Sequence, residues 1–264
     1  MSDLGELIFR VADEQGEVHV YQDARLRYLT FGNQVEQSCV DLDRPARLQH
    51  VYTQAMLLAL LLVDGPRDAL LLGLGGGSLA RALRAADRGI WIRGIEQRAA
   101  VIDAARAYFR LPDDRRFDVV CSDAADFLAV DSGYHDLIFA DLYLATGMYP
   151  QQASAEFLQL CRGRLTARGV LVVNLWASDY PAHREASAAL HGVFDGEVVQ
   201  THVQGGNILA FAFAETVPAI ERVGLFEAAQ TLGLRLEIPL QRHARNLWRQ
   251  NSDRLRGGPS RRRG

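Results

Sequence analysis

Beyond Pro66, short apolar segments alternate with longer amphipathic ones, and this alternation limits the fold more than any other feature of the sequence. The strand-like segments are Ala69–Leu72, Ile90–Ile95, Asp118–Cys121, Leu137–Ala140 and Val170–Leu175. Between them the sequence predicts helices at Ser78–Ala86, Gln97–Phe109, Ala124–Val130 and Ala153–Leu165. Strands separated by helices form βαβ units, whose strands run parallel and whose sheet is covered on both faces. We therefore expect an α/β fold with a mostly parallel sheet.

The N-terminal part has a different pattern, in which turn residues separate short strand-like segments. These segments predict a small antiparallel β domain with strands at Glu6–Ala12, Val18–Asp23, Leu26–Phe31 and Val35–Asp41. An apolar stretch then predicts one long helix over Arg47–Val63, which Asp64, Gly65 and Pro66 would end.

The C-terminal part predicts an antiparallel edge to the sheet. A helix near Ala182–His191 precedes two strands, Glu197–Gln204 and Asn207–Phe213, and Gly205 and Gly206 between these strands are typical of a hairpin. A last helix is expected over Ala219–Leu232.

The composition suits a globular protein of the cytoplasm. The longest apolar run, Ala55–Val63, is much shorter than the roughly 20 residues of a membrane-spanning helix. The acidic start lacks the basic-then-apolar pattern of a signal peptide. Cys39, Cys121 and Cys161 are odd in number and lie in apolar stretches, which indicates free thiols in a reducing compartment. We therefore expect a cytoplasmic protein without a membrane partner.

Positive charge is concentrated at the C-terminal end. Gln241–Gly264 contains eight arginines and one acid, so this segment carries a net charge of +7 and residues 1–240 carry −10. An acidic body with a basic tail is a poor nucleic-acid-binding domain. We expect residues 241–264 to form a disordered, solvated tail, with binding to a polyanion as the alternative. The expected domains are thus 1–45 (β-strands), 46–240 (α/β) and the tail at 241–264.

A glycine-rich turn follows the first strand of the alternating region. It runs Gly73-Leu74-Gly75-Gly76-Gly77 and leads into a helix at Ser78. Glycine lets a ligand approach the backbone, and the start of the helix presents unpaired N–H groups. Such a turn either binds a ligand or only packs the helix against the strand. The residues at the ends of the next strands help to distinguish these two roles.

Two acids at the ends of neighbouring strands favour a nucleoside ligand. Glu96 ends the second strand, where a carboxylate can accept hydrogen bonds from both hydroxyls of a ribose. Asp123, followed by Ala124, ends the third strand and suits the amino group of an adenine; its alternative role is a helix cap. Ser78 stands where a dinucleotide site has its third glycine. The pattern therefore favours an adenosyl thioether or sulfonium ligand over a dinucleotide.

Asp141 ends the fourth strand and is the candidate catalytic residue. Displacement at a sulfonium carbon needs a neutral nucleophile, and an amine with a pKa near 10 is mostly protonated at pH 7. A neighbouring carboxylate can orient this amine and accept its proton. Tyr143 and Tyr149 follow and are expected to form an aromatic wall for the substrate, whereas His135, before the strand, is expected at the surface. No His, Cys or Asp spacing is typical of a metal site.

The order of these motifs resembles the spermidine synthase-like (polyamine aminopropyltransferase) family, over about Tyr28 to Phe213. Two further motifs support the resemblance: Gly32–Ser38, with a ligand-facing glutamine at Gln37, and His50–Gln54, with a tyrosine at Tyr52. The resemblance implies a β-stranded N-terminal domain, a methyltransferase-type Rossmann domain and, in most members, a homodimer. It also implies transfer of an aminopropyl group from decarboxylated S-adenosylmethionine to an amine.

Two positions depart from the family pattern. The family's glycine turn normally carries an aspartate, whose place Gly75 takes, and a second acid normally stands where this chain has Leu144. The loss of two carboxylates weakens the attraction for a cationic donor tail and for a diamine. We therefore expect a transferase that uses S-adenosylmethionine or its decarboxylated form to alkylate an amine. A methyltransferase and a non-catalytic homologue that binds adenosyl ligands remain the alternatives.

Overall fold

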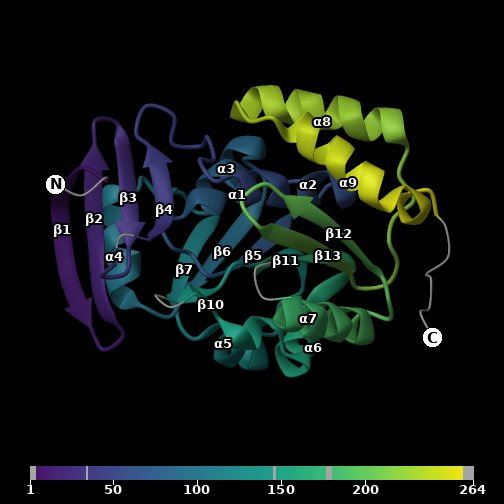
Figure 1. Ribbon diagram of the computed structural model, residues 1–264, viewed down its shortest axis with the longest axis horizontal. Coiled ribbons are helices and arrows are strands. Elements are labelled where there is room, and N and C mark those ends of the chain that lie inside the picture. Colours follow the sequence, from purple (N-terminus) through teal and green to yellow (C-terminus); the bar gives the residue numbers. More distant parts are fainter. Residues whose placement is uncertain (1–3, 34, 145–146, 177–179, 258–264) are drawn as a thin grey trace.

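The computed structural model describes residues 4–33, 35–144, 147–176 and 180–257, and these contain two main β-sheets, with helices around the larger one, and a separate two-stranded pair (Figure 1). The smaller sheet is antiparallel, in the order β1-β2-β3-β4, and its strands are β1 (Glu6–Asp13), β2 (Gly16–Asp23), β3 (Leu26–Thr30) and β4 (Glu36–Asp41). Its inner face, with Val18, Val20, Leu29 and Val40, packs against helix α4 (Ala99–Tyr108).

The larger sheet has seven strands in the order β12-β13-β11-β8-β5-β6-β7. The central strands β11, β8, β5, β6 and β7 are parallel, while β13 and β12 form an antiparallel edge. The strands are β5 (Asp68–Leu72), β6 (Trp91–Glu96), β7 (Phe117–Cys121), β8 (His135–Ala140), β11 (Leu165–Trp176), β12 (Val198–Val203) and β13 (Asn207–Phe213). The predicted fold class, a mostly parallel α/β sheet with an antiparallel edge and a separate antiparallel sheet, is confirmed.

Helices cover both faces of the larger sheet (Figure 1). One face carries α1 (Val51–Met56), α2 (Ala59–Leu62), α3 (Ser78–Ala86), α8 (Arg222–Leu236) and α9 (Leu240–Leu255). The other carries α5 (Ala124–Val130), α6 (Ala155–Gly163) and α7 (Tyr180–Val193). Between β8 and α6 lie β9 (Tyr143–Leu144), β10 (Gly147–Met148) and the 3₁₀-helix η1 (Pro150–Ala153). No helix in these described ranges is long and apolar enough to cross a bilayer.

The single long helix predicted over Arg47–Val63 is wrong. The structure instead has two short helices, α1 and α2, separated at Leu57 and Leu58. At this break the backbone bonds tighten to i→i−3, with Leu58 N donating to Ala55 O at 3.1 Å and Leu61 N to Leu58 O at 2.8 Å. Residues 53–59 are all buried, so the segment has no exposed face whose period could have located the break.

The C-terminal end also differs from the prediction. Residues 240–255 form helix α9 rather than a disordered tail, and Leu240, Leu247 and Leu255 are fully buried in the core. Leucines at helical spacing supply the stripe that packs against α8 and α1, while Arg242, Arg245 and Arg249 of the same helix are exposed. Helix α8 begins at Arg222, later than the predicted start, because the Glu221 side chain caps it by accepting from two backbone N–H groups.

Candidate active site

A cleft of about 580 Å³ opens where the parallel strands end, next to the N-terminal sheet. Register pairs Leu72 with Ala140 and Glu96 with Cys121, so the ends of β5 to β8 lie at one edge. The residues predicted for the site that line this cleft are Gln37, Tyr52, Gly73, Gly75, Glu96, Asp123, Ala124, Asp141, Tyr143 and Tyr149. Gly77 does not line it: this residue is buried, and a Cβ on it would come within 2.0 Å of Leu111 Cδ2.

The glycine turn needs glycine at the end of β5 for a steric reason. Gly73 has a φ of +90°, and a Cβ there would approach the backbone oxygen of Asp141 to 2.5 Å. Gly75 and Gly77 also have positive φ values. These conformations bring the turn against the end of β8, so the turn forms one wall of the cleft.

Glu96 is buried and tied to the glycine turn. Its Oε2 accepts from the backbone N–H groups of Leu74 at 3.4 Å and Gly75 at 3.3 Å, and its Oε1 accepts from Arg98 N at 3.1 Å. Burial raises the pKa of Glu96, while these backbone hydrogen bonds oppose the rise. The carboxyl group is therefore held in one orientation at the wall of the cleft.

Asp123 caps helix α5, as its alternative interpretation expects. Its Oδ1 accepts from Ala125 N at 2.7 Å and from Asp126 N at 3.2 Å. Both contacts use the same oxygen, and within the described residues Oδ2 accepts no hydrogen bond. The cap and a ligand contact are therefore compatible, because they need different oxygens of a side chain that lines the cleft.

Asp141 accepts one hydrogen bond on each carboxylate oxygen. Tyr52 Oη donates to Oδ2 at 3.1 Å, and Asn174 Nδ2 donates to Oδ1 at 2.9 Å. Burial raises the pKa of Asp141, and the two donors oppose the rise. The pKa of Tyr52 is raised by burial and by the charge of Asp141, so this tyrosine stays a donor at neutral pH.

Sequence reasoning missed the amide network that holds Asp141. Asn174 is fully buried at the end of β11, and its Oδ1 accepts from Asn207 Nδ2 at 2.9 Å. This bond fixes which end of the Asn174 amide faces Asp141, and Nδ2 also donates to Tyr143 Oη at 3.1 Å. The position of Asn174 near the end of a parallel strand could have indicated a residue of the site. Asn207 belongs to the antiparallel hairpin, and no pattern in the sequence indicates that it reaches the site.

The N-terminal sheet is joined to the cleft by polar contacts. Ser38 Oγ accepts from Gly76 N at 2.9 Å, and Arg98 forms a 2.8 Å ion pair with Asp13. Glu36 of β4 lies 3.1 Å from His50 Nε2 just before α1. These contacts bring Gln37 and Tyr52 to the same cleft as the acids of the parallel sheet.

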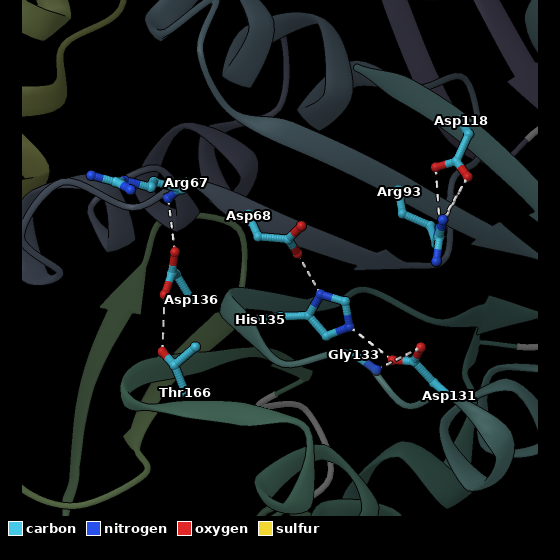
Figure 2. A network of polar contacts seen from close by, with 9 residues as sticks. All are labelled: Arg67, Asp68, Arg93, Asp118, Asp131, Gly133, His135, Asp136 and Thr166. Atoms are coloured by element: carbon cyan, nitrogen blue, oxygen red, sulfur yellow. Dashed lines mark hydrogen bonds and ion pairs between the residues drawn. The ribbon is translucent and has the colours of Figure 1, made fainter. Parts of the chain in front are cut away.

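His135 lies at the opposite edge of the sheet from the cleft. It begins β8 and is buried, with its ring between Asp68 and Asp131 (Figure 2). The expectation of a surface histidine is therefore wrong, because these two acids surround the ring. Burial alone would lower the pKa of His135, but the hydrogen bonds to both acids raise it overall.

Metal ligands do not cluster in the described part of the chain. Within those residues there is no group of three or more His, Cys, Asp or Glu side chains that could hold an ion.

Comparisons with known proteins relate the whole arrangement to a family of transferases. A polyamine aminopropyltransferase of Chromobacterium violaceum is 32% identical over 205 residues, covering 76% of this chain and 77% of that protein. The eEF1A lysine and N-terminal methyltransferase homolog of Drosophila melanogaster is 27% identical over 204 residues, covering 72% of this chain and 30% of that protein. No family model matches the sequence.

Solved structures show the same fold. Spermidine synthase of Thermotoga maritima has a TM-score of 0.72 at 17% identity, covering 91% of this chain and 84% of that one. Human methyltransferase-like protein 13 in complex with SAH has a TM-score of 0.61 at 24% identity, covering 72% of this chain and 94% of that one. The extent of the similarity to the Chromobacterium enzyme decides the assignment: the chain belongs to the polyamine aminopropyltransferase family.

Proposed function

We propose that this chain is a transferase that takes an aminopropyl or related alkyl group from an adenosyl sulfonium donor and gives it to an amine. The donor is S-adenosylmethionine or its decarboxylated form, which is a co-substrate, and no metal takes part. The observation that carries the proposal is that Glu96, Asp123 and Asp141, from three different strand ends, line one cleft in a chain of this family.

The donor would be held by the first two acids and the glycine turn. Glu96 would accept from the ribose hydroxyls, because its carboxyl group is fixed at the cleft wall. Asp123 would accept from the adenine amino group through the oxygen that the helix cap leaves free of hydrogen bonds. The turn from Gly73 to Gly75 would contact the methionine-derived tail, and Gln37 would close the pocket from the N-terminal sheet.

Asp141 would act on the amine nucleophile. As the nitrogen attacks, the new C–N bond forms, the C–S bond breaks and the sulfur leaves as a neutral thioether. The proton that the amine must lose would pass to the Asp141 carboxylate, whose pKa is raised by burial. Tyr52 and Asn174 would hold this carboxylate in position, and Tyr143 and Tyr149 would flank the acceptor.

A methyltransferase is the second candidate, and the glycine turn is the observation that favours it. Residues 73–78 contain no acid, and Leu144, whose side chain lies outside the described residues, is not one either. Each missing charge-assisted contact to an ammonium group would be worth about 1.5–3 kcal/mol. The absence of an acid in the turn suits a donor that keeps its own carboxylate, as S-adenosylmethionine does.

The setting of the reaction is part of the same proposal. The relative that shows the family, the Chromobacterium enzyme, is a polyamine aminopropyltransferase, which supports a small-molecule amine as acceptor. We also propose, from the resemblance to this family, that the chain works as a homodimer in the cytoplasm; sedimentation of the purified chain tests the oligomeric state.

Calorimetry with three ligands tests the function. S-adenosylmethionine, its decarboxylated form and methylthioadenosine are titrated separately, and transfer to putrescine and to a panel of other amines is followed by mass spectrometry. Tight binding of the decarboxylated donor with transfer to putrescine supports polyamine synthesis, and preference for the carboxylated donor with methylation supports the second candidate. Binding of these ligands without transfer to any amine would support the third possibility, a non-catalytic homologue that binds adenosyl ligands. No binding of any of the three ligands would refute the proposal.

The ligand contacts need a matched pair of variants. Asp123→Asn keeps a side chain that can cap α5 but removes the charge, while Asp126→Asn removes an exposed acid of the same helix. The proposal predicts weaker methylthioadenosine binding for the first variant alone.

A further inference from the structure

A second cavity, of about 570 Å³, lies between α9, α1 and the end of β12. It is separate from the active cleft but shares helix α1 with it: Tyr52 faces the cleft, while Val51 and Gln54 line the second cavity. We call this second cavity the α9 groove. Its charged lining residues are three arginines, Arg242, Arg245 and Arg249, and no acid lines it.

The three arginines form one face of α9. Their spacing of three and four residues places them on the same side of the helix, over about 10 Å of its length. Arg245 stacks over the Phe226 ring at 5.7 Å, and Arg249 donates to Asn246 Oδ1 at 2.7 Å. Each guanidinium group has five N–H donors, so these contacts leave most of the donors available.

Among the residues that the structure describes, no acid is paired with these three charges. Within the described part of the chain, no ion pair joins Arg242, Arg245 or Arg249 to a carboxylate. Arg254, on the same helix, shows the contrast, because it pairs with Glu197 at 2.7 Å. Asp253, the one acid of α9, does not line the groove.

A buried histidine also lines the groove. His243 is buried beside Gln54, and burial together with the charge of Arg242 lowers the pKa of His243 to about 4. Residues 1–240 carry a net negative charge, so this positive region is local and not a property of the whole surface.

We propose that the α9 groove binds a linear oligophosphate, either free or as the phosphate chain of a nucleotide. Arginine forks bind phosphate oxygens in pairs, and three of them along one helix face match several linked phosphates better than a single one. The volume of the groove, about 570 Å³, lies within the range of about 300–1,000 Å³ that small-molecule sites have. This site does not depend on the function proposed for the active cleft.

Calorimetric titration of the full chain tests the site. The probes are tripolyphosphate, ATP and inorganic phosphate, each at the same physiological ionic strength and without divalent cations. We expect tripolyphosphate to bind at least tenfold more tightly than inorganic phosphate. If ATP and tripolyphosphate bind with equal affinity, the groove recognises the phosphates alone. If ATP binds more tightly, the groove also contacts the nucleoside. Both outcomes support the site. Absence of tripolyphosphate binding overturns it.

Two triple variants of equal charge distinguish the groove from general electrostatic attraction. In the first, all three groove arginines are replaced by glutamine. In the second, the exposed Arg88, Arg106 and Arg222, which lie outside the groove, are replaced instead. We expect the first variant to lose at least tenfold in tripolyphosphate affinity and the second to change less than threefold, with both melting like the parent chain. Equal losses in the two variants would overturn the proposal.

Discussion

The Asp141→Asn substitution removes the charge of this side chain but retains its shape. In the parent chain Oδ1 accepts from Asn174 and Oδ2 accepts from Tyr52. In the variant the amide oxygen can keep the contact with Asn174, and the amide NH₂ can donate to Tyr52 Oη once the tyrosine proton turns away. Both contacts therefore survive, and the variant loses the ability to accept a proton.

The size of the effect follows from this geometry. A positioned general base contributes about 10²–10⁴-fold, or roughly 3–5 kcal/mol of the activation barrier. We expect kcat to fall by this factor in Asp141→Asn, measured as release of methylthioadenosine for an aminopropyl donor or of S-adenosylhomocysteine for a methyl donor. Methylthioadenosine affinity should change less than about twofold, because the nucleoside contacts lie on Glu96 and Asp123. A variant that keeps more than a tenth of the parent turnover would refute the role of Asp141.

Three further predictions concern stability, each measured by chemical denaturation. Gly73→Ala should lower the free energy of unfolding by at least about 2 kcal/mol, because φ is +90° and the added Cβ would lie 2.5 Å from a backbone oxygen. The control is Gly163→Ala, whose added Cβ has nothing within 4 Å and which should leave the free energy of unfolding unchanged. His135→Gln should lower the free energy of unfolding by about 2 kcal/mol at pH 6. This loss should shrink as the pH rises through the raised pKa of His135, because the two acids stabilise the protonated ring. A loss of stability that does not depend on pH would contradict this. Removal of residues 240–264 deletes α9 and exposes the core beneath it. Burial of its three leucines alone contributes about 5 kcal/mol to the free energy of unfolding. The shortened chain should therefore lack the cooperative unfolding transition of the parent chain.

The parallel sheet and the positions of its acids could be predicted because they depend on local patterns. Glu96, Asp123 and Asp141 each follow an apolar run of strand length, and parallel strands end at a common edge. The helices on that sheet have an apolar stripe of period 3.6, so Ser78–Ala86 and Ala124–Val130 were predicted with the bounds that the structure has.

The predictions were wrong for two segments. In one the apolar residues show no helical period, and in the other this period is present but many arginines lie between the apolar residues. Residues 53–59 are buried on all sides, so nothing in the sequence marks the break between α1 and α2. In α9 the apolar Leu240, Ala244 and Leu247 recur at helical spacing, but the dense arginines suggested a disordered tail.

The supports of the site could not be found from the sequence because they come from distant parts of the chain. Asn207 reaches Asn174 across the antiparallel edge, and Ser38 reaches the glycine turn from the other sheet. Such contacts depend on how the sheets pack, which no local pattern encodes. For His135 only one acidic partner is distant: Asp68 begins β5, whereas Asp131, at the end of α5, lies four residues before the histidine.

The most direct test of the account is a crystal structure of the chain with methylthioadenosine. We expect the ligand to occupy the cleft at the ends of β5 to β8, with its ribose hydroxyls on the Glu96 carboxylate and its adenine amino group on Asp123. A ligand bound elsewhere, or a cleft that stays empty at saturating ligand with Glu96 turned away from it, would contradict the account.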